Sequence, residues 1–148
     1  MLLDTKYFGR IPYSPEDVIT FPNGLFGFAT ETQFLLLPFS GSQGNMLCLQ
    51  SLSAPSPAFI LMNPFSLKPD YAPVLSPEEL QLMGASQSCQ LCYYVMCVAK
   101  EPVGDSTVNL RCPVVINPEL HRGTQVILDT DQYHMRHRLS EFSNQEVE

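Results

Sequence analysis

The residues of this sequence that could carry chemistry are few, and their spacing favours structural roles. Cys89 and Cys92 form a Cys-x-x-Cys pair, which is half of the ligand set of a zinc ribbon, and a ribbon needs two such pairs, each on a turn. Residues 89–99 have the composition of a strand, and in a strand positions i and i+3 point to opposite faces. We therefore expect no metal at this pair.

The three histidines, His121, His134 and His137, offer no clearer site. His134 and His137 lie near Asp131, but they fall in a segment with strand alternation, where an i, i+3 pair diverges. The acidic residues cluster at turns and at a helix start, whereas acid–base catalysis needs two ionisable groups held together in a pocket. The pattern predicts neither a metal nor a cofactor.

Two further catalytic patterns are incomplete. Gly24-x-x-Gly27 lacks the lysine and the helix that follow a phosphate-binding glycine loop. A Cys–His nucleophile pair has no local signature in the sequence. The residues therefore predict a protein that is not an enzyme. A Cys- or metal-dependent enzyme is the least favoured alternative, and it would contain a bound metal or a thiol of low pKa.

The composition indicates one globular domain with many short elements. A chain of 148 residues with 45% hydrophobic and 16% charged residues can bury a sizeable core. Its 13 prolines and 8 glycines favour turns over long helices. The net charge of −7 argues against direct nucleic-acid binding, which needs clustered cations. It favours a basic protein partner, and is equally compatible with plain solubility.

The sequence features predict a cytoplasmic location. Residues 1–7 contain an acid and a base and no apolar signal segment. No uninterrupted apolar run approaches the ~20 residues that a membrane-spanning helix needs. The five cysteines, an odd number, are expected to be reduced thiols that pack as small hydrophobic residues.

The elements that must position these residues are mainly strands, organised around a hairpin. Residues 107–117 alternate, so that Val108, Leu110, Cys112, Val114 and Ile116 should share one face. Pro113 has no N–H for a ladder and predicts an edge or a bulge there. Residues 122–129 should pair back through the turn at 117–123.

Other segments extend this sheet and supply one helix. Strands are expected at 5–11, 18–21, 34–39, 46–52, 58–63, 89–99 and 133–139, with a turn at 14–17 and a loop at 64–72. Ser76, Pro77 and Glu79 form a capping box for one short helix at about 76–84. We therefore predict a mainly β fold, a compact antiparallel barrel-like or sandwich domain over 1–140, with a disordered acidic tail at 141–148.

An aromatic loop, Phe21-Pro-Asn-Gly-Leu-Phe-Gly-Phe28, follows the second expected strand. Its phenylalanines either fold back and cap the core, or form an exposed apolar patch for a partner.

An ordered set of short motifs resembles the FliW family of bacterial flagellar assembly factors and runs from about residue 7 to 139. The matching motifs are Ile19-x-Phe21-Pro22-x-Gly24-Leu25-x-Gly27-Phe28, Phe34-x-Leu36, Leu49-Gln50-Ser51, Phe59-x-x-x-Asn63-Pro64, Asp70-Tyr71, Val108-Asn109-Leu110-x-x-Pro113-Val114-Val115-Ile116-Asn117 and Gly123-x-Gln125-Val126-Ile127-Leu128. In two places the sequence departs from the family pattern: Phe26 stands where proline is usual, and Ala29 where glutamate is usual. Phe26 lies in the aromatic loop and Ala29 directly follows it, so both bear on partner affinity or preference if the loop contacts a partner.

The resemblance implies a β-barrel-like chaperone without catalytic activity. Proteins of this family bind flagellin in the cytoplasm and also bind the translational repressor CsrA. When flagellin is secreted, the freed factor sequesters CsrA and relieves repression of flagellin translation, in a mode that does not compete with RNA. Competition by flagellin is then mass action.

The motif residues expected at the surface are the candidates for partner contact. We expect Asn63, Asp70, Tyr71, Asn109, Asn117 and Gln125 to lie outside the core, with the polar ones either contacting partners or satisfying turn backbone groups. The candidates completing the partner-binding set are Leu25, Phe26 and Phe28 of the aromatic loop. An alternative function, a small-ligand β-barrel, would need an enclosed apolar cavity of a few hundred Å3.

Overall fold

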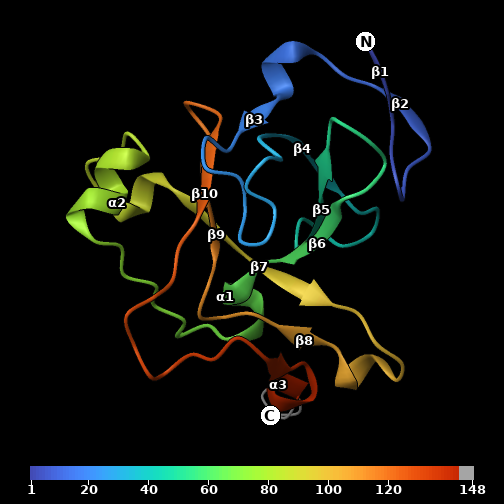
Figure 1. Cartoon of the computed structure of the whole chain (residues 1–148). Helices are drawn as coiled ribbons and strands as arrows, with labels where there is room; N and C mark the ends of the chain where they lie inside the picture. Colours follow the sequence, from blue (N-terminus) through green and yellow to red (C-terminus); the bar gives the residue numbers. More distant parts are fainter. Residues whose placement is uncertain (144–148) are drawn as a thin grey trace.

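Seven strands close into a barrel in the computed structural model, which describes residues 1–143 (Figure 1). Around the ring they are β7 (Cys92–Val98), β6 (Ala58–Met62), β5 (Met46–Ser51), β4 (Gln33–Pro38), β3 (Ile19–Thr20), β10 (Arg122–Gln125) and β9 (Val114–Asn117), which pairs again with β7. All neighbours are antiparallel except β3 and β10, which pair in parallel at Arg122 and Thr20. The mainly β, barrel-like prediction is confirmed.

The remaining elements lie outside the ring (Figure 1). They are the hairpin β1 (Leu2–Asp4) and β2 (Arg10–Pro12), the strands β8 (Thr107–Val108) and β11 (His137–Arg138), the helices α1 (Pro64–Leu67), α2 (Pro77–Leu82) and α3 (Ser140–Ser143), and the 3-10 turns η1 (Pro15–Asp17), η2 (Ser88–Gln90) and η3 (Val103–Asp105). The helix α2 has the predicted capping box, since the Glu79 N–H donates to Ser76 Oγ and the Ser76 N–H donates to Glu79 Oε1. α3 includes residues 141–143 of the predicted tail, whose other residues lie outside the described part.

Some predicted boundaries were wrong for local reasons. The strand expected at 5–11 is mostly a turn between β1 and β2, because Gly9 adopts φ +66° and its carbonyl accepts the Thr5 N–H. The loop expected at 64–72 begins with α1, which Asn63 caps by accepting the Phe65 N–H at 2.9 Å. Cys89 lies in η2 and not in the strand that holds Cys92.

The strand predicted at 107–117 is interrupted, and this is the largest departure from the sequence pattern. Cys97 of β7 pairs with Val108 of β8, and Tyr94 of β7 pairs with Val114 of β9. Tyr94 and Cys97 are three positions apart on β7, whereas their partners Val114 and Val108 are six positions apart. The facing chain therefore accommodates three extra residues beside Pro113. An odd insertion reverses which face each later side chain occupies. The single buried face predicted for 108–116 is therefore wrong.

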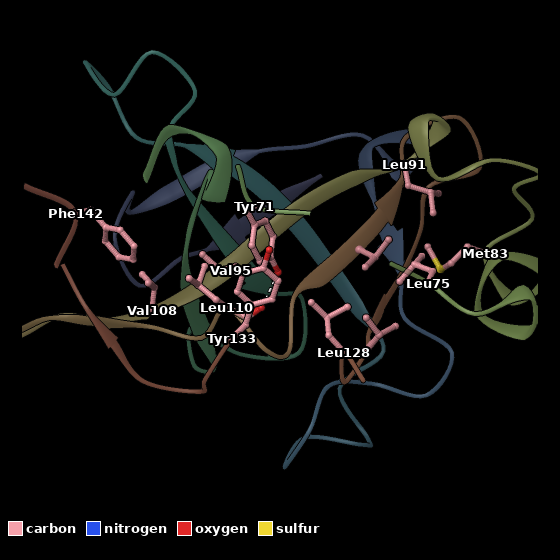
Figure 2. Packing of buried hydrophobic residues seen from close by; sticks show 12 residues of the cluster. Tyr71, Leu75, Met83, Leu91, Val95, Val108, Leu110, Leu128, Tyr133 and Phe142 are labelled. Carbon is pink, nitrogen blue, oxygen red and sulfur yellow. Dashed lines mark hydrogen bonds between the residues drawn. The ribbon is translucent and has the colours of Figure 1, made fainter. Parts of the chain in front are cut away.

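The consequence is two hydrophobic clusters on opposite sides of the barrel wall. The inner cluster takes side chains from around the ring: Ile19, Phe21, Leu25, Phe34, Leu49, Leu61, Val114 and Ile116. The outer cluster includes Val95, Val108, Leu110, Val115, Val126 and Leu128, and is covered by Tyr71, Leu75, Met83, Leu91, Tyr133 and Phe142. Figure 2 shows its extent, from Phe142 and Val108 at one end to Met83 and Leu91 at the other.

The cysteines are free thiols, and two of the five are fully enclosed. Cys48 and Cys112 are 0% and 1% exposed. Burial raises the pKa of Cys48 from 9.0 to about 11, and it also raises the pKa of Cys97 and Cys112. These shifts are opposite to that of a nucleophilic thiolate. Only Cys89 is exposed.

Thiol labelling should therefore be dominated by Cys89. With an aromatic disulfide reagent at neutral pH, Cys48 should react at least ~100-fold more slowly than Cys89, because a pKa shift from 9.0 to about 11 alone removes that much thiolate. The fast phase should vanish in Cys89→Ser and persist in Cys48→Ser. Retention of the fast phase in Cys89→Ser would contradict the assignment.

Candidate partner-binding surface

The aromatic loop is a tight turn that closes one end of the barrel. Leu25 and Phe28 form an antiparallel bridge, with the Phe28 N–H donating to the Leu25 carbonyl at 2.8 Å. Gly27 adopts φ +83°, which the third position of a type II turn requires. Gly24 adopts φ +65°, and a Cβ there would lie 2.3 Å from the Phe28 carbonyl oxygen. The loop is thus fixed by two glycines that other residues cannot replace without strain.

The loop divides its apolar side chains between core and surface. Leu25 is 2% exposed and belongs to the inner cluster. Phe26 at the tip is 51% exposed, and Phe28 is 40% exposed with its ring 5.1 Å from that of Phe59. The loop combines both predicted arrangements of side chains, because Phe21 and Leu25 cap the core while Phe26 and Phe28 are exposed at the surface. We call Phe26 and Phe28 the aromatic patch.

The side chain of Gln125 attaches this loop to the barrel. Its Oε1 accepts the Phe26 N–H at 3.0 Å, and its Nε2 donates to the Cys112 carbonyl at 3.1 Å. Gln125 is 9% exposed, so its amide connects the tip of the loop to the interrupted strand within a largely desolvated site. The backbone of the aromatic patch is consequently held in place by contacts within the chain itself.

The predicted asparagines have structural contacts. Asn63 caps α1, and Asn109 Oδ1 accepts the Cys112 N–H at 2.9 Å within the irregular segment between β8 and β9. Asn117 Nδ2 donates to the Met83 carbonyl at 2.8 Å, and its Oδ1 accepts the N–H groups of Glu119 and Leu120. These bonds agree with the alternative in which the polar motif residues satisfy backbone groups of turns.

Asp70 and Tyr71 are adjacent in sequence and differ completely in environment. The Asp70 side chain is 80% exposed and lies 3.1 Å from Lys68 Nζ. Tyr71 is 4% exposed; its hydroxyl donates to the Leu110 carbonyl at 2.7 Å, and its ring is 4.7 Å from that of Tyr133 (Figure 2). Burial raises the pKa of Tyr71. Asp70 is therefore accessible to a partner, whereas Tyr71 supports the outer cluster.

The expectation that all six motif residues lie outside the core was wrong for half of them. Tyr71, Asn117 and Gln125 are buried, at 4%, 5% and 9% exposure. Their polarity suggested the surface, but each polar group has an internal partner, which is the condition under which such groups are buried. Their role as partner contacts stays a prediction.

The sequence reasoning missed an apolar groove next to α2. Its volume is about 610 Å3, and its lining includes Val74 and Ile127, which are 77% and 53% exposed. Ile127 follows Gln125 by two residues, and the inward neighbours Val126 and Leu128 are buried. The alternation of Val126 and Leu128 with Gln125 and Ile127 in the sequence could have indicated this exposed isoleucine.

The histidine pair also differs from expectation. The His134 N–H donates to His137 Nε2 at 2.8 Å, and the rings stack at 5.3 Å. His134 precedes β11 and does not lie in a strand with His137, so the predicted divergence does not hold. His137 Nδ1 lies 3.1 Å from Glu141 Oε2. Within residues 1–143, no three His, Cys, Asp or Glu side chains gather as a metal site would require.

The middle of the barrel is filled by the inner cluster, and a cavity of about 370 Å3 lies at its margin. Apolar side chains such as Ile19, Leu36 and Ile116 line it together with the polar Asp17 and His121. The size falls within the range of small-ligand sites.

Comparison with known proteins identifies the family. The family model described as "FliW protein" matches residues 2–139. The chain belongs to the FliW family. A relative from Geobacillus sp. (strain WCH70), described as "Flagellar assembly factor FliW", is 37% identical over 139 residues, which cover 94% of this chain and 95% of the relative. One from Ruminiclostridium cellulolyticum (strain ATCC 35319 / DSM 5812 / JCM 6584 / H10), described in the same words, is 33% identical over 99% of this chain and 100% of its own length.

The FliW fold is shared with a solved structure. A crystal structure of the flagellar assembly factor FliW superposes with a TM-score of 0.87 at 34% identity, covering 94% of this chain and 96% of the other. These relatives are described as assembly factors and not as enzymes. In the described part of this FliW-family chain, no helix has the length and apolar character that crossing a membrane requires.

Proposed function

We propose that this FliW-family protein is a cytoplasmic chaperone that binds flagellin and antagonises the translational repressor CsrA by stoichiometric binding. Flagellin and CsrA would share one pool of the protein, so secretion of flagellin frees it to sequester CsrA and restores flagellin translation. Such coupling needs only mass action. Family membership supports this role, since the relatives are described as flagellar assembly factors.

The observation that carries the proposal is the aromatic patch. Phe26 is 51% exposed, although its backbone is fixed through Gln125. Aromatic side chains, phenylalanine included, are enriched at protein–protein interfaces, and a preordered loop binds at a lower entropic cost. The net charge of −7 supports association with a basic RNA-binding protein through long-range attraction.

Native co-purification is the direct experiment. The chain, tagged and expressed in its host, should recover both flagellin and CsrA, and added flagellin monomer should displace CsrA from the purified complex. Recovery of neither protein would refute the proposal. Recovery of a small molecule bound at the barrel margin in their place would favour the alternative of a small-ligand barrel.

Phe26→Asp should weaken flagellin binding about 30-fold or more, because truncating a hot-spot aromatic costs at least ~2 kcal/mol of binding energy. Stability should change by less than ~1 kcal/mol, since the side chain is half exposed. Calorimetric titration measures the affinity, and urea denaturation measures the stability.

Val103→Asp is the matched control for Phe26→Asp, because Val103 is 70% exposed in η3, a separate turn of the chain. It makes the same charge change and should leave flagellin affinity intact. Equal losses in both variants would show that net charge, and not the aromatic patch, governs binding.

Asp70→Lys should slow association with CsrA several-fold at low salt. Asp70 is highly exposed, so its carboxylate contributes to steering of a basic partner. The variant should also show a smaller dependence of the association rate on ionic strength. Stopped-flow or surface-binding kinetics measure both, with Asp4→Lys as an exposed acidic control. Unchanged kinetics in Asp70→Lys would remove this residue from the interface.

A further inference from the structure

The extension of the sheet formed by β8 and β11 carries a concentration of positive charge that the proposed function does not use. A hollow of about 350 Å3 is lined by Lys100, Arg136 and Arg138, together with Thr107 and Asp105. The chain has 8 lysines and arginines against 15 aspartates and glutamates. Three of the eight lysines and arginines therefore line this hollow together with a single acid. The local charge is positive, whereas the net charge of the chain is negative.

The strand register explains why these side chains converge. Arg138 pairs with Thr107, and Thr107 pairs with Val98 of β7. Directly paired residues of neighbouring strands share a face. Arg136 directly precedes β11 and Lys100 lies two residues after β7, and both line the same hollow as Arg138 and Thr107.

The opposite face of this extension is fixed on the core. Val108 pairs with both Cys97 and His137, and Val108 and Cys97 pack in the outer cluster. The Lys100 N–H donates to Ser106 Oγ at 2.8 Å, which ties the end of β7 to the start of β8. The cationic face therefore points to solvent, because Val108 and Cys97 on the opposite face are packed in the outer cluster.

These three cations form no ion pair in the described part of the chain. Its ion pairs join Arg10 to Asp4, Lys68 to Asp70 and His137 to Glu141, and none involves Lys100, Arg136 or Arg138. Like charges gathered in one hollow repel one another. A bound anion would replace that repulsion by charge-assisted hydrogen bonds.

We propose that this hollow binds the phosphate group of a small phosphate monoester. The two guanidinium groups offer paired N–H donors that match phosphate oxygens, Lys100 adds a point charge, and Thr107 adds a hydroxyl. Val98, 58% exposed on the same face, provides an apolar contact for the organic part of the ligand. The volume is at the lower end for small-molecule sites, and the net charge of −7 opposes a long polyanion such as RNA.

The test is a titration of the full chain, at constant ionic strength, with inorganic phosphate and with a nucleoside 5′-monophosphate, followed by amide chemical shifts. Saturable 1:1 shifts should centre on Thr107 and Arg138, with the monoester binding more tightly than phosphate. Arg138→Gln and Arg136→Gln should each weaken binding about tenfold. Arg10→Gln removes the same charge from an exposed strand residue and should have no effect.

Three results would overturn the proposal: shifts that do not saturate, equal affinity in Arg138→Gln and Arg10→Gln, or tighter binding of a long RNA or an anionic vesicle than of the monoester. A thermal denaturation midpoint matching that of the unaltered chain establishes that each variant is folded. This site is independent of the aromatic patch, so the Phe26→Asp variant should bind the monoester with unchanged affinity.

Discussion

Gly123→Ala is expected to lower the free energy of unfolding by about 3 kcal/mol, the upper part of the range for overpacking a core. Gly123 lies in β10 opposite Ile116 and has no positive φ. The Cβ that alanine would add at position 123 lies 2.3 Å from Cζ of Phe21 and within 2.7 Å of two further carbons of that ring. Phe21 is fully buried against Phe34, with ring centroids 5.3 Å apart, so its ring has little space to move.

The direction of this effect distinguishes packing from backbone entropy. In an unobstructed strand, alanine would stabilise relative to glycine by restricting the unfolded chain. Gly104→Ala is the matched control, because a Cβ there would meet only Ser140 Cβ at 3.5 Å, an ordinary contact. Urea denaturation should place Gly104→Ala within ~0.5 kcal/mol of the unaltered chain.

A double substitution identifies the clash. Phe21→Leu alone leaves space in the inner cluster, and Gly123→Ala would occupy part of that space. The double variant should therefore be more stable than the sum of the two single effects by at least ~1 kcal/mol. Additive effects, or a Gly123→Ala variant as stable as Gly104→Ala, would show that Phe21 does not fill the space beside β10.

Gln125→Ala is expected to cost about 3 kcal/mol, because it leaves two backbone groups without their partner. The Phe26 N–H and the Cys112 carbonyl each lose a hydrogen bond in a largely buried site, at roughly 1–3 kcal/mol each. Amide exchange at Phe26 should accelerate more than that of other turn residues, since the loop tip loses its attachment to the barrel.

The same variant should weaken flagellin binding even though Gln125 is buried. A loop that must be ordered on binding costs free energy that a fixed loop does not. Gln132→Ala is the control, because Gln132 is exposed and the substitution keeps its backbone N–H, which donates to Thr130 Oγ1. Unchanged Phe26 exchange in Gln125→Ala would contradict the role assigned to this side chain.

Local signals in the sequence were sufficient for most elements of the barrel. The capping box at Ser76 and Glu79 predicted α2, because both partners lie within one helical turn. Short apolar runs punctuated by glycines and prolines predicted β4, β5 and β6 within one residue at each end. The hairpin of β9 and β10 followed from two β-rich runs and the turn between them.

Long-range contacts explain what the sequence could not supply. Gln125 and Phe26, which are joined by a hydrogen bond, are 99 positions apart in the sequence. Asn117 and Met83, joined in the same way, are 34 positions apart. No local pattern indicates that a polar side chain will find a buried carbonyl at that separation. Pro113 predicted an edge or a bulge at this position. The length of the insertion decides which face is buried, and only the pairing with β7 fixes that length.

Calorimetric titration of the purified chain with monomeric flagellin from its host tests the central claim most directly. That claim is that the protein acts by stoichiometric binding through a preformed aromatic patch. The expected result is a saturable 1:1 complex that forms with the unaltered chain and with Val103→Asp, and that is weakened about 30-fold or more in Phe26→Asp. Absence of a complex, or a complex equally tight in Phe26→Asp, would contradict the account.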